Sequence, residues 1–328
     1  MRILQIVGGE KPKDGSRENI FVHRQVNSLK ALIPEMHILY AGKGSNPTDM
    51  TSLARQLRTE IKTFRPDVLH AQYGTVTGAV AVMSAGDVPT IVSFGGDEVY
   101  GTYINEHTTK SLRTSLALQF SKYCAKRANV CIAKNQEMGR VLHNWGAKRV
   151  EIIPNGVNLG VFREHFQNDC RAQLQLKPNI RYVVFAVRDN DYVKRRDLAE
   201  KAVNLYRIAS SQEIELLILD NIDPELIPLY LNAGDVLLLC SNHEGSPNIV
   251  KEALACNRPV VSTDVGDVRE QFGEVHGVYI VSQDPFEIAE GLNKAFGLSR
   301  SNGRKFVKHF SEEYVADRLV NLYKSVAK

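Results

Sequence analysis

The sequence predicts an α/β protein with two domains, each built on a parallel β-sheet. Short apolar and β-branched runs alternate with longer segments of helical periodicity, which is the pattern of successive βαβ units with helices on both faces of a sheet. Turn-forming residues gather in NGVNLGVF, residues 155–162, and the alternation then starts again. With 328 residues and 43% hydrophobic composition, the chain can bury two cores of ordinary domain size.

In the first domain, the apolar runs predict strands and the stretches of helical period predict helices. We expect strands at residues 2–7, 37–41, 68–72, 89–94, 129–134 and 149–154, and helices at 21–32, 51–64 and 107–128.

The second domain repeats the pattern after the boundary. We expect strands at residues 181–187, 215–220, 235–240, 258–264 and 278–282, and helices at 198–209 and 248–256. Because ligands of open α/β sheets bind at the carboxyl ends of the strands, the loops after these strands are the places to look for chemistry.

Composition excludes several classes of protein. No stretch approaches the roughly 20 apolar residues of a membrane span, and MRILQIVGGE lacks the apolar core of a signal peptide, so we expect a cytoplasmic protein. The five cysteines show no Cys-x-x-Cys spacing, which disfavours a zinc site. GGEKPKDG, after the first strand, lacks the Gly-x-Gly-x-x-Gly spacing of a nicotinamide dehydrogenase.

The loop HEGSPNIVKE, residues 243–252, follows an expected buried strand and opens a helix. Ser246 is a suitable N-cap and Pro247 a suitable first helical residue, so Asn248 and its successors should be helical. The free N–H groups and positive dipole end of that helix form an anion site, and Gly245 lets a ligand approach the backbone. A phosphate would fit there.

Two glutamates, Glu244 and Glu252, lie on either side of this anion site. Carboxylates accept hydrogen bonds, and the donors beside the pyrophosphate of a nucleotide sugar are hydroxyl groups of the sugar and the ribose. The alternative is a structural one, in which Glu244 complements the helix dipole and Glu252 is a solvated side chain beside Lys251. The spacing alone does not decide between the two.

Longer motifs do decide. EGSPNIVKEALACNRPVVSTDVGDVRE strongly resembles the Glu-x7-Glu segment of the retaining glycosyltransferases of family four, especially bacterial enzymes that build teichuronic acid, capsule and exopolysaccharide. In the family's order, RPDVLHAQYG is similar to its central N-domain strand, VEIIPNGVNLGVF to its interdomain segment, and HFSEEYVADRLVNLY to its terminal helix. The resemblance covers nearly the whole chain.

The resemblance implies a GT-B architecture, with two Rossmann-like domains whose parallel sheets face a cleft. It assigns residues 1–163 to an acceptor-binding domain and 164–310 to a domain that binds the nucleotide sugar. The terminal helix, residues 311–328, is expected to return to the first domain.

The same resemblance assigns the chemistry. Arg188, Lys194 and Glu244 are the expected catalytic residues; the two cations would clamp the donor pyrophosphate, although Arg195 could take the place of Lys194. Fixed cations suit this task because the departing nucleoside diphosphate gains negative charge. Glu252 would bind the ribose and Glu244 would face the donor sugar. The expected donor-binding residues are Gly8, Gly9, Asp97, Arg188, Lys194, Glu244, Gly245, Ser246, Pro247, Asn248, Ile249, Val250 and Glu252.

We expect neither a metal nor a cofactor, since the nucleoside-diphosphate sugar is a substrate. Asp189-Asn190-Asp191 imitates an Asp-x-Asp metal motif, but it lies between the two expected cations. One departure from the family concerns the SFGGDE loop, where Gly95 takes the position of a common histidine and leaves Asp97 or Glu98 as polar candidates; Asp97 is our choice.

The predicted function is therefore a retaining, metal-independent transfer of a hexose to a lipid-linked or polysaccharide acceptor in bacterial surface glycan synthesis. A non-catalytic partner subunit and a sugar-nucleotide epimerase are the alternatives. Residues 1–165 carry 21 Lys and Arg against 14 Asp and Glu, so this half is basic. Its helix at 107–128 either packs on its own domain or rests on the anionic inner face of the plasma membrane. Nucleic acid is not an expected partner.

Overall fold

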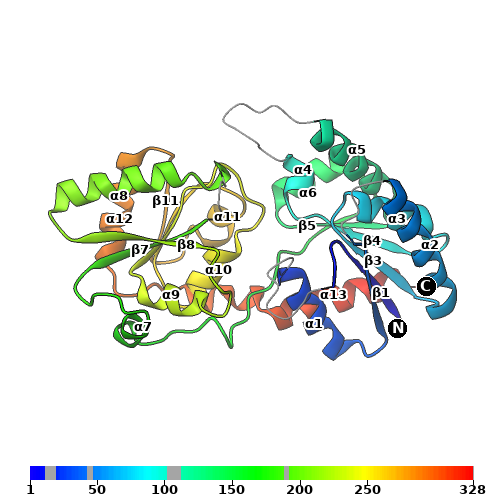
Figure 1. The fold of residues 1–328 in the computed structure, drawn as a ribbon, viewed down its shortest axis with the longest axis horizontal. Coiled ribbons are helices and arrows are strands. Elements are labelled where there is room, and N and C mark those ends of the chain that lie inside the picture. The colour runs from blue at the N-terminus through cyan, green and yellow to red at the C-terminus, as the bar shows by residue number, and fades with distance from the viewer. Residues whose placement is uncertain (12–19, 43–46, 102–111, 188–191, 328) are drawn as a thin grey trace. The chain divides into compact units, whose positions relative to one another are not determined.

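The computed structural model describes residues 1–11, 20–42, 47–101, 112–187 and 192–327. The chain divides into two compact units (Figure 1). Unit 1 comprises Met1–Gly156 and Glu312–Lys328, and unit 2 comprises Val157–Ser311. The sequence placed the boundary at residue 163 and the start of the terminal segment at residue 311.

Unit 1 contains a parallel sheet with the strand order β2-β1-β3-β4-β5-β6. Its strands are β1 (Ile3–Val7), β2 (Met36–Tyr40), β3 (Val68–Gln72), β4 (Thr90–Ser93), β5 (Val130–Ala133) and β6 (Val150–Ile152). Its helices are α1 (Ile20–Leu32), α2 (Pro47–Phe64), α3 (Val76–Ser84), α4 (Asp97–Tyr100), α5 (Leu112–Arg127), α6 (Gln136–Asn144) and α13 (Glu312–Val326).

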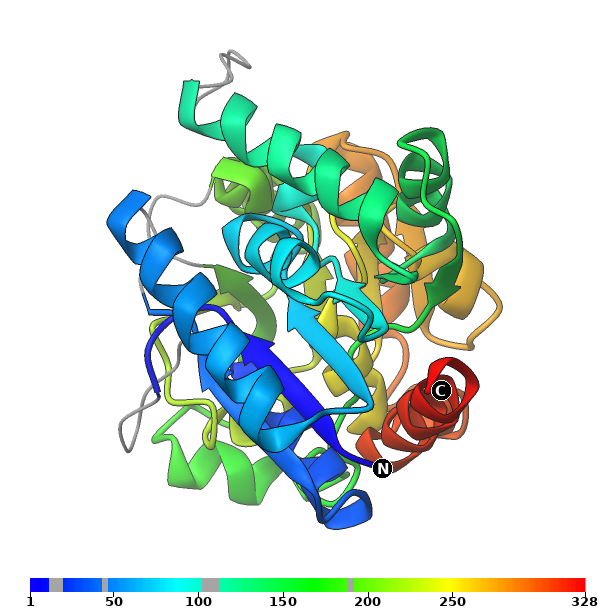
Figure 2. The same ribbon diagram turned by 90° about the vertical axis from the view of Figure 1, so that its right-hand side faces the viewer.

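The two faces of this sheet bury different helices, as the alternation of side chains along each strand requires. On β1, Leu4 and Ile6 belong to the core formed with α2, α3 and α5. Ile3 and Val7 belong to the core formed with α1 and α13, which lie on the opposite face (Figures 1 and 2). The terminal helix, last in the chain, therefore completes the unit that holds the first strand.

Unit 2 contains a second parallel sheet, with the order β11-β10-β9-β7-β8. Its strands are β7 (Arg181–Val187), β8 (Ile214–Asp220), β9 (Val236–Leu239), β10 (Val260–Thr263) and β11 (Val278–Val281). Its α-helices are α7 (Gln167–Gln173), α8 (Arg196–Ser210), α9 (Ile227–Ala233), α10 (Asn248–Ala255), α11 (Val268–Phe272) and α12 (Pro285–Phe296), and its 3-10 segments are η1 (Tyr192–Lys194), η2 (Gly303–Lys305) and η3 (Val307–Phe310).

Helices cover both faces of this sheet as well. Helices α8 and α12 form one core with the strands, and α9, α10, α11 and η3 form the other. The predicted fold class, two α/β domains with parallel sheets, is confirmed, and every predicted strand is present. Within the described residues, no helix is both long and apolar enough to cross a membrane.

Candidate functional site

In unit 2, η1, the loop after β9 and the end of β10 meet at the carboxyl edge of the sheet. The Asn242 N–H donates to the Val193 carbonyl at 2.8 Å, which joins the loop after β9 to η1. The Thr263 hydroxyl donates to the Ser241 carbonyl at 2.9 Å, which joins β10 to the same loop. Three chain segments distant in sequence are thus fixed around one place.

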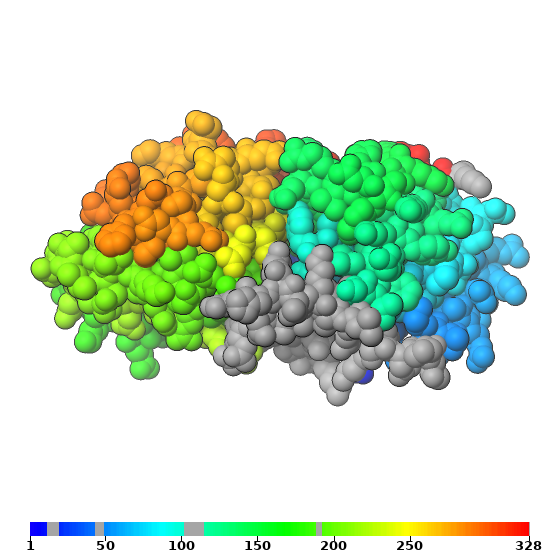
Figure 3. All heavy atoms as spheres, turned by 90° about the horizontal axis from the view of Figure 1, so that it is seen from above, coloured from blue at the N-terminus to red at the C-terminus, as the bar shows by residue number. Residues whose placement is uncertain are grey.

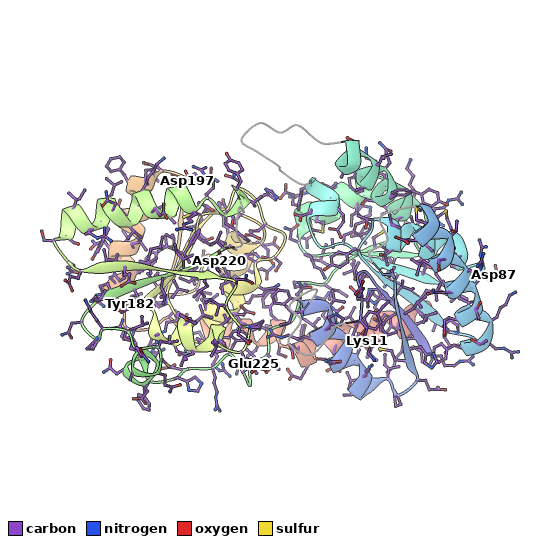
Figure 4. All side chains as sticks on the ribbon, in the orientation of Figure 1. Lys11, Asp87, Tyr182, Asp197, Asp220 and Glu225 are labelled. Atoms are coloured by element: carbon purple, nitrogen blue, oxygen red, sulfur yellow. The ribbon has the colours of Figure 1, made fainter. Side chains whose placement is uncertain are left out.

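Lys194 and Glu244 are brought together there. The Lys194 Nζ donates to Glu244 Oε1, and the Ser241 hydroxyl donates to the same oxygen at 2.7 Å. The side chains are 24% and 14% exposed, so a ligand can still reach them. Arg195 instead forms two hydrogen bonds with Asp197, labelled in Figure 4, at 2.9 and 3.1 Å. Of the two cations, Lys194 is therefore the partner of Glu244.

Helix α10 begins beside this pair. The prediction that Ser246 caps the helix and Pro247 is its first residue is wrong, because Pro247 is the N-cap and the helix starts at Asn248. The Ser246 hydroxyl is engaged elsewhere: it accepts a hydrogen bond from Lys251 Nζ at 3.1 Å. Ser246 therefore uses its hydroxyl for the contact with Lys251 and does not cap the helix.

The other expected donor-binding residues on α10 differ in burial and in their hydrogen-bond partners. The side chain of Val250 is fully buried, and its N–H donates to the Pro247 carbonyl at 3.2 Å. Glu252 is 7% exposed, and so is not the solvated side chain of the alternative interpretation. Asn248 Oδ1 is buried and has no hydrogen-bond partner in the described part of the chain. A buried acceptor in the first turn of a helix can receive a hydroxyl or N–H of a ligand.

Arg188, the other expected catalytic cation, lies outside the described residues, as does Asp189-Asn190-Asp191. Among the residues that are described, no group of three or more His, Cys, Asp or Glu side chains could hold a metal ion. The five cysteines are all buried, and burial raises the pKa of Cys240 and of Cys256 to about 12.

In unit 1, the expected residues also gather at a carboxyl edge. Gly8 follows β1 and Gly95 follows β4, and the ring of Tyr73, which follows β3, lies between them. A Cβ at Gly8 would lie 3.7 Å from Tyr73 Cδ2, and one at Gly95 would lie 3.3 Å from Tyr73 Cε1. Tyr73 has a φ of 75°, an uncommon conformation for a bulky side chain. Gly9 pairs with Gly42 through backbone bonds of 3.0 and 3.1 Å.

The loop without the family histidine is organised by Glu98. Its carboxylate accepts the N–H groups of Gly95 at 2.7 Å and Gly96 at 3.0 Å. Burial raises the pKa of Glu98, and these hydrogen bonds oppose the shift. Asp97, the residue chosen from the sequence, is exposed, whereas Glu98 is 7% exposed.

Comparison with known proteins identifies the family. Residues 11–161 match the family model described as Glycosyltransferase Family 4, and residues 165–297 match the model described as Glycosyl transferases group 1. The chain belongs to the family-four glycosyltransferases. The two models together extend over both units, as two Rossmann-like domains of GT-B type require.

Relatives of this glycosyltransferase include the protein named as teichuronic acid biosynthesis glycosyltransferase TuaC of Bacillus subtilis, which is 23% identical over 70% of this chain. The chain spans 61% of the length of TuaC. Sucrose-phosphate synthase from Thermosynechococcus elongatus has a TM-score of 0.78 at 16% identity, over 99% of each chain. HepE from Anabaena in complex with UDP-glucose has a TM-score of 0.74 at 15% identity, over 99% of this chain and 100% of its own. These two structures are evidence for the fold.

Three polar residues of this glycosyltransferase were missed from the sequence. Lys251 entered the sequence interpretation only as the neighbour of Glu252; it is 1% exposed, and Asp267 is 2% exposed. Ser241 is fully buried and supports Glu244. One signal in the sequence indicates that Lys251 faces inward. Residues three or four apart share one face of a helix, and Lys251 is four residues after Pro247 and three before the apolar Leu254, both of which are buried.

Proposed function

We propose that the chain is a retaining, metal-independent glycosyltransferase that moves a hexose from a nucleoside-diphosphate sugar to a lipid-linked or polysaccharide acceptor in bacterial surface glycan synthesis. The observation that carries the proposal is the Lys194–Glu244 pair at the carboxyl edge of the unit 2 sheet, beside the start of α10. A cation, a carboxylate and a helix N-terminus together match the phosphates and hydroxyls of such a donor.

In this proposal, Lys194 stabilises the departing diphosphate. An ammonium group has three donors, so Lys194 can hold Glu244 and still donate to a phosphate oxygen. Glu244, fixed by Lys194 and Ser241, accepts from hydroxyls of the donor sugar. Glu252 accepts from the ribose hydroxyls. Fixed charges in a partly dry site act strongly on charge that develops in the transition state.

The acceptor side of the proposal involves α5 in unit 1. Leu116 and Tyr123 are 54% and 37% exposed on this helix, and Lys126 and Arg127 are exposed near its end. The outer side of α5 contributes to the molecular surface (Figure 3). Apolar and basic side chains on one helix suit the interface of an anionic bilayer, where a lipid-linked acceptor would be found.

A panel of UDP-, GDP- and ADP-sugars tests the donor assignment, with binding measured by thermal shift and turnover by nucleotide release in the presence of EDTA. We expect one donor class to stabilise the protein and to release nucleotide. NMR of the product should show the same anomeric configuration as in the donor. Glu252→Gln should weaken binding of that nucleotide by about 1–3 kcal/mol, because ribose hydroxyls lose a charged acceptor.

Glu213→Gln is the matched control, because Glu213 is exposed and directly precedes β8 at the opposite edge of the same sheet. Equal nucleotide affinity in wild type and Glu252→Gln would show that Glu252 of α10 does not bind the ribose. Binding without nucleotide release would favour the non-catalytic subunit, and conversion of the donor to an epimer would favour the epimerase.

A further inference from the structure

A buried lysine lies beneath the turn that precedes α10. Lys251 is 1% exposed, although lysine is among the residues that proteins bury least. Its Nζ donates to Ser246 Oγ at 3.1 Å and lies 5.7 Å from the centre of the Phe310 ring of η3. Burial lowers the pKa of Lys251 to about 8, and the carboxylates of Asp267 and Glu252 oppose this shift.

Asp267 is the counterpart of this lysine. It precedes α11 but makes no side-chain capping bond with that helix, and it is 2% exposed. A hydrogen bond from the Ser246 hydroxyl reaches its carboxylate and, together with the Lys251 charge, opposes the rise in the pKa of Asp267 that burial causes. Ser246 thus accepts from the lysine and donates to the aspartate.

The loop that carries Asp267 also packs directly on the turn. Gly266 has a φ of 60°, and a Cβ there would lie 2.7 Å from the Gly245 carbonyl oxygen and 3.3 Å from Glu244 Cβ. Glycine is required by both the backbone conformation and the closeness of this contact. The turn at 244–247 is therefore held by α10 below it and by the 264–267 loop beside it.

Stability alone is a weak reason to keep these charges. Removing a lysine and a carboxylate from water is costly for each ion, and apolar side chains of similar size often stabilise a core as well or better. One carboxylate oxygen, Asp267 Oδ1, is buried without a hydrogen-bond partner in the described part of the chain. A buried polar network that lacks some of its hydrogen bonds lowers the stability of the fold, so we expect these residues to contribute to something other than stability.

We propose that Lys251, Ser246 and Asp267 form a positioning triad that holds the 244–247 turn in the conformation that receives the diphosphate of the donor. The proposal rests on the proposed function of the α10 site. The lysine and the aspartate fix the Ser246 side chain from both sides, and this fixes the backbone of the turn next to the helix N-terminus.

The triad is tested with Lys251→Met, Asp267→Asn and the double variant, in the full chain. Calorimetry with UDP, GDP and ADP gives the affinity for the nucleoside diphosphate, initial rates with the matching sugar nucleotide give KM and kcat, and thermal unfolding gives stability. Each single variant leaves one buried charge without its partner, so we expect a lower Tm and at least tenfold weaker nucleotide binding.

The double variant separates positioning from structure. With both charges gone, its Tm should return toward that of the wild type, while nucleotide binding stays at least tenfold weaker and donor KM stays raised. Recovery of binding along with stability would overturn the proposal, as would wild-type affinity in all three variants. Lys201→Met is the control, because the Lys201 side chain is 68% exposed on α8 and its loss should change neither quantity.

The nucleotide titrations of the wild type distinguish failure of the proposed function from failure of the triad proposal. A wild type that binds none of UDP, GDP and ADP overturns the assignment of the α10 site as a donor site, and the triad with it. A wild type that binds one of them leaves the outcome of the triad proposal to the variants alone.

Discussion

Lowering the pH should destabilise unit 1 through His70. This side chain is fully buried on β3; its Nδ1 lies 2.6 Å from the hydroxyl of Tyr323 on α13, and its Nε2 lies 2.7 Å from the hydroxyl of Ser93 on β4. The Gln5 amide donates to the Tyr323 hydroxyl at 2.8 Å. Burial, and then the positive charge of Lys134, lowers the pKa of His70 to about 3. The folded protein therefore holds His70 neutral.

The size of the effect follows from the difference in pKa between the folded and unfolded states. In the unfolded chain, His70 takes the ordinary pKa of histidine, about 6.5. As the pH falls below that value, the unfolded state takes up a proton that the folded state refuses, so the free energy of unfolding falls until the pH reaches about 3. Between pH 7 and pH 5, the loss from this one group is about 2 kcal/mol.

Urea titrations at pH 7 and pH 5 measure this loss, followed by the fluorescence of Trp145, the single tryptophan, which lies in unit 1. In His70→Gln, the residue cannot titrate, so the change between the two pH values should shrink by about 2 kcal/mol relative to wild type. His143→Gln, at an exposed position of α6, should leave the wild-type change intact. An equal pH dependence in wild type and His70→Gln, or titration of His70 near pH 6.5 by NMR, would refute the reasoning.

Two further perturbations address the surface of α5 and the loop without the histidine. Reversing the charge at Lys126 and Arg127 should reduce co-sedimentation with anionic liposomes, since each cation near such a surface contributes about 1 kcal/mol; binding that does not depend on anionic lipid would leave α5 as an ordinary surface helix. Gly95→His should lower stability by about 1–3 kcal/mol in a denaturation assay, because its Cβ would lie 3.3 Å from the Tyr73 ring and 3.6 Å from Glu98 Oε2. Gly96→His is the control, since a Cβ at Gly96 meets open space within 4 Å, and equal stability of both variants would contradict the crowding.

Periodicity and loop position were sufficient to predict the fold and the neighbourhood of the candidate site. Every strand was predicted, because apolar runs between turn residues are a local signal. The meeting of Lys194 and Glu244 was also predictable in outline, since loops after parallel strands share one edge.

What could not be predicted depends on partners distant in sequence. Ser246 was expected to cap α10, but Lys251 and Asp267 engage its hydroxyl, and Asp267 is on a loop beyond the next strand. The inward direction of Lys251 depends on the same contacts and on the Phe310 ring. In the SFGGDE loop, Glu98 rather than Asp97 turns inward, because two backbone N–H groups converge on its carboxylate. No local propensity contains this information.

The two buried polar networks differ in a way that separates anchoring from function. Around His70, both ring nitrogens have partners and the group is neutral, so the network can fix α13 to the sheet without an uncompensated charge. Around Lys251, the groups are ionisable and Asp267 Oδ1 has no partner among the described residues. A buried network whose polar groups all have hydrogen-bond partners is explained by its contribution to the stability of the fold. A buried network that leaves a polar atom without a partner lowers stability, so at the edge of a binding turn we expect it to serve ligand binding. That contrast is why the Lys251 network, rather than the His70 network, is the one expected to affect the donor.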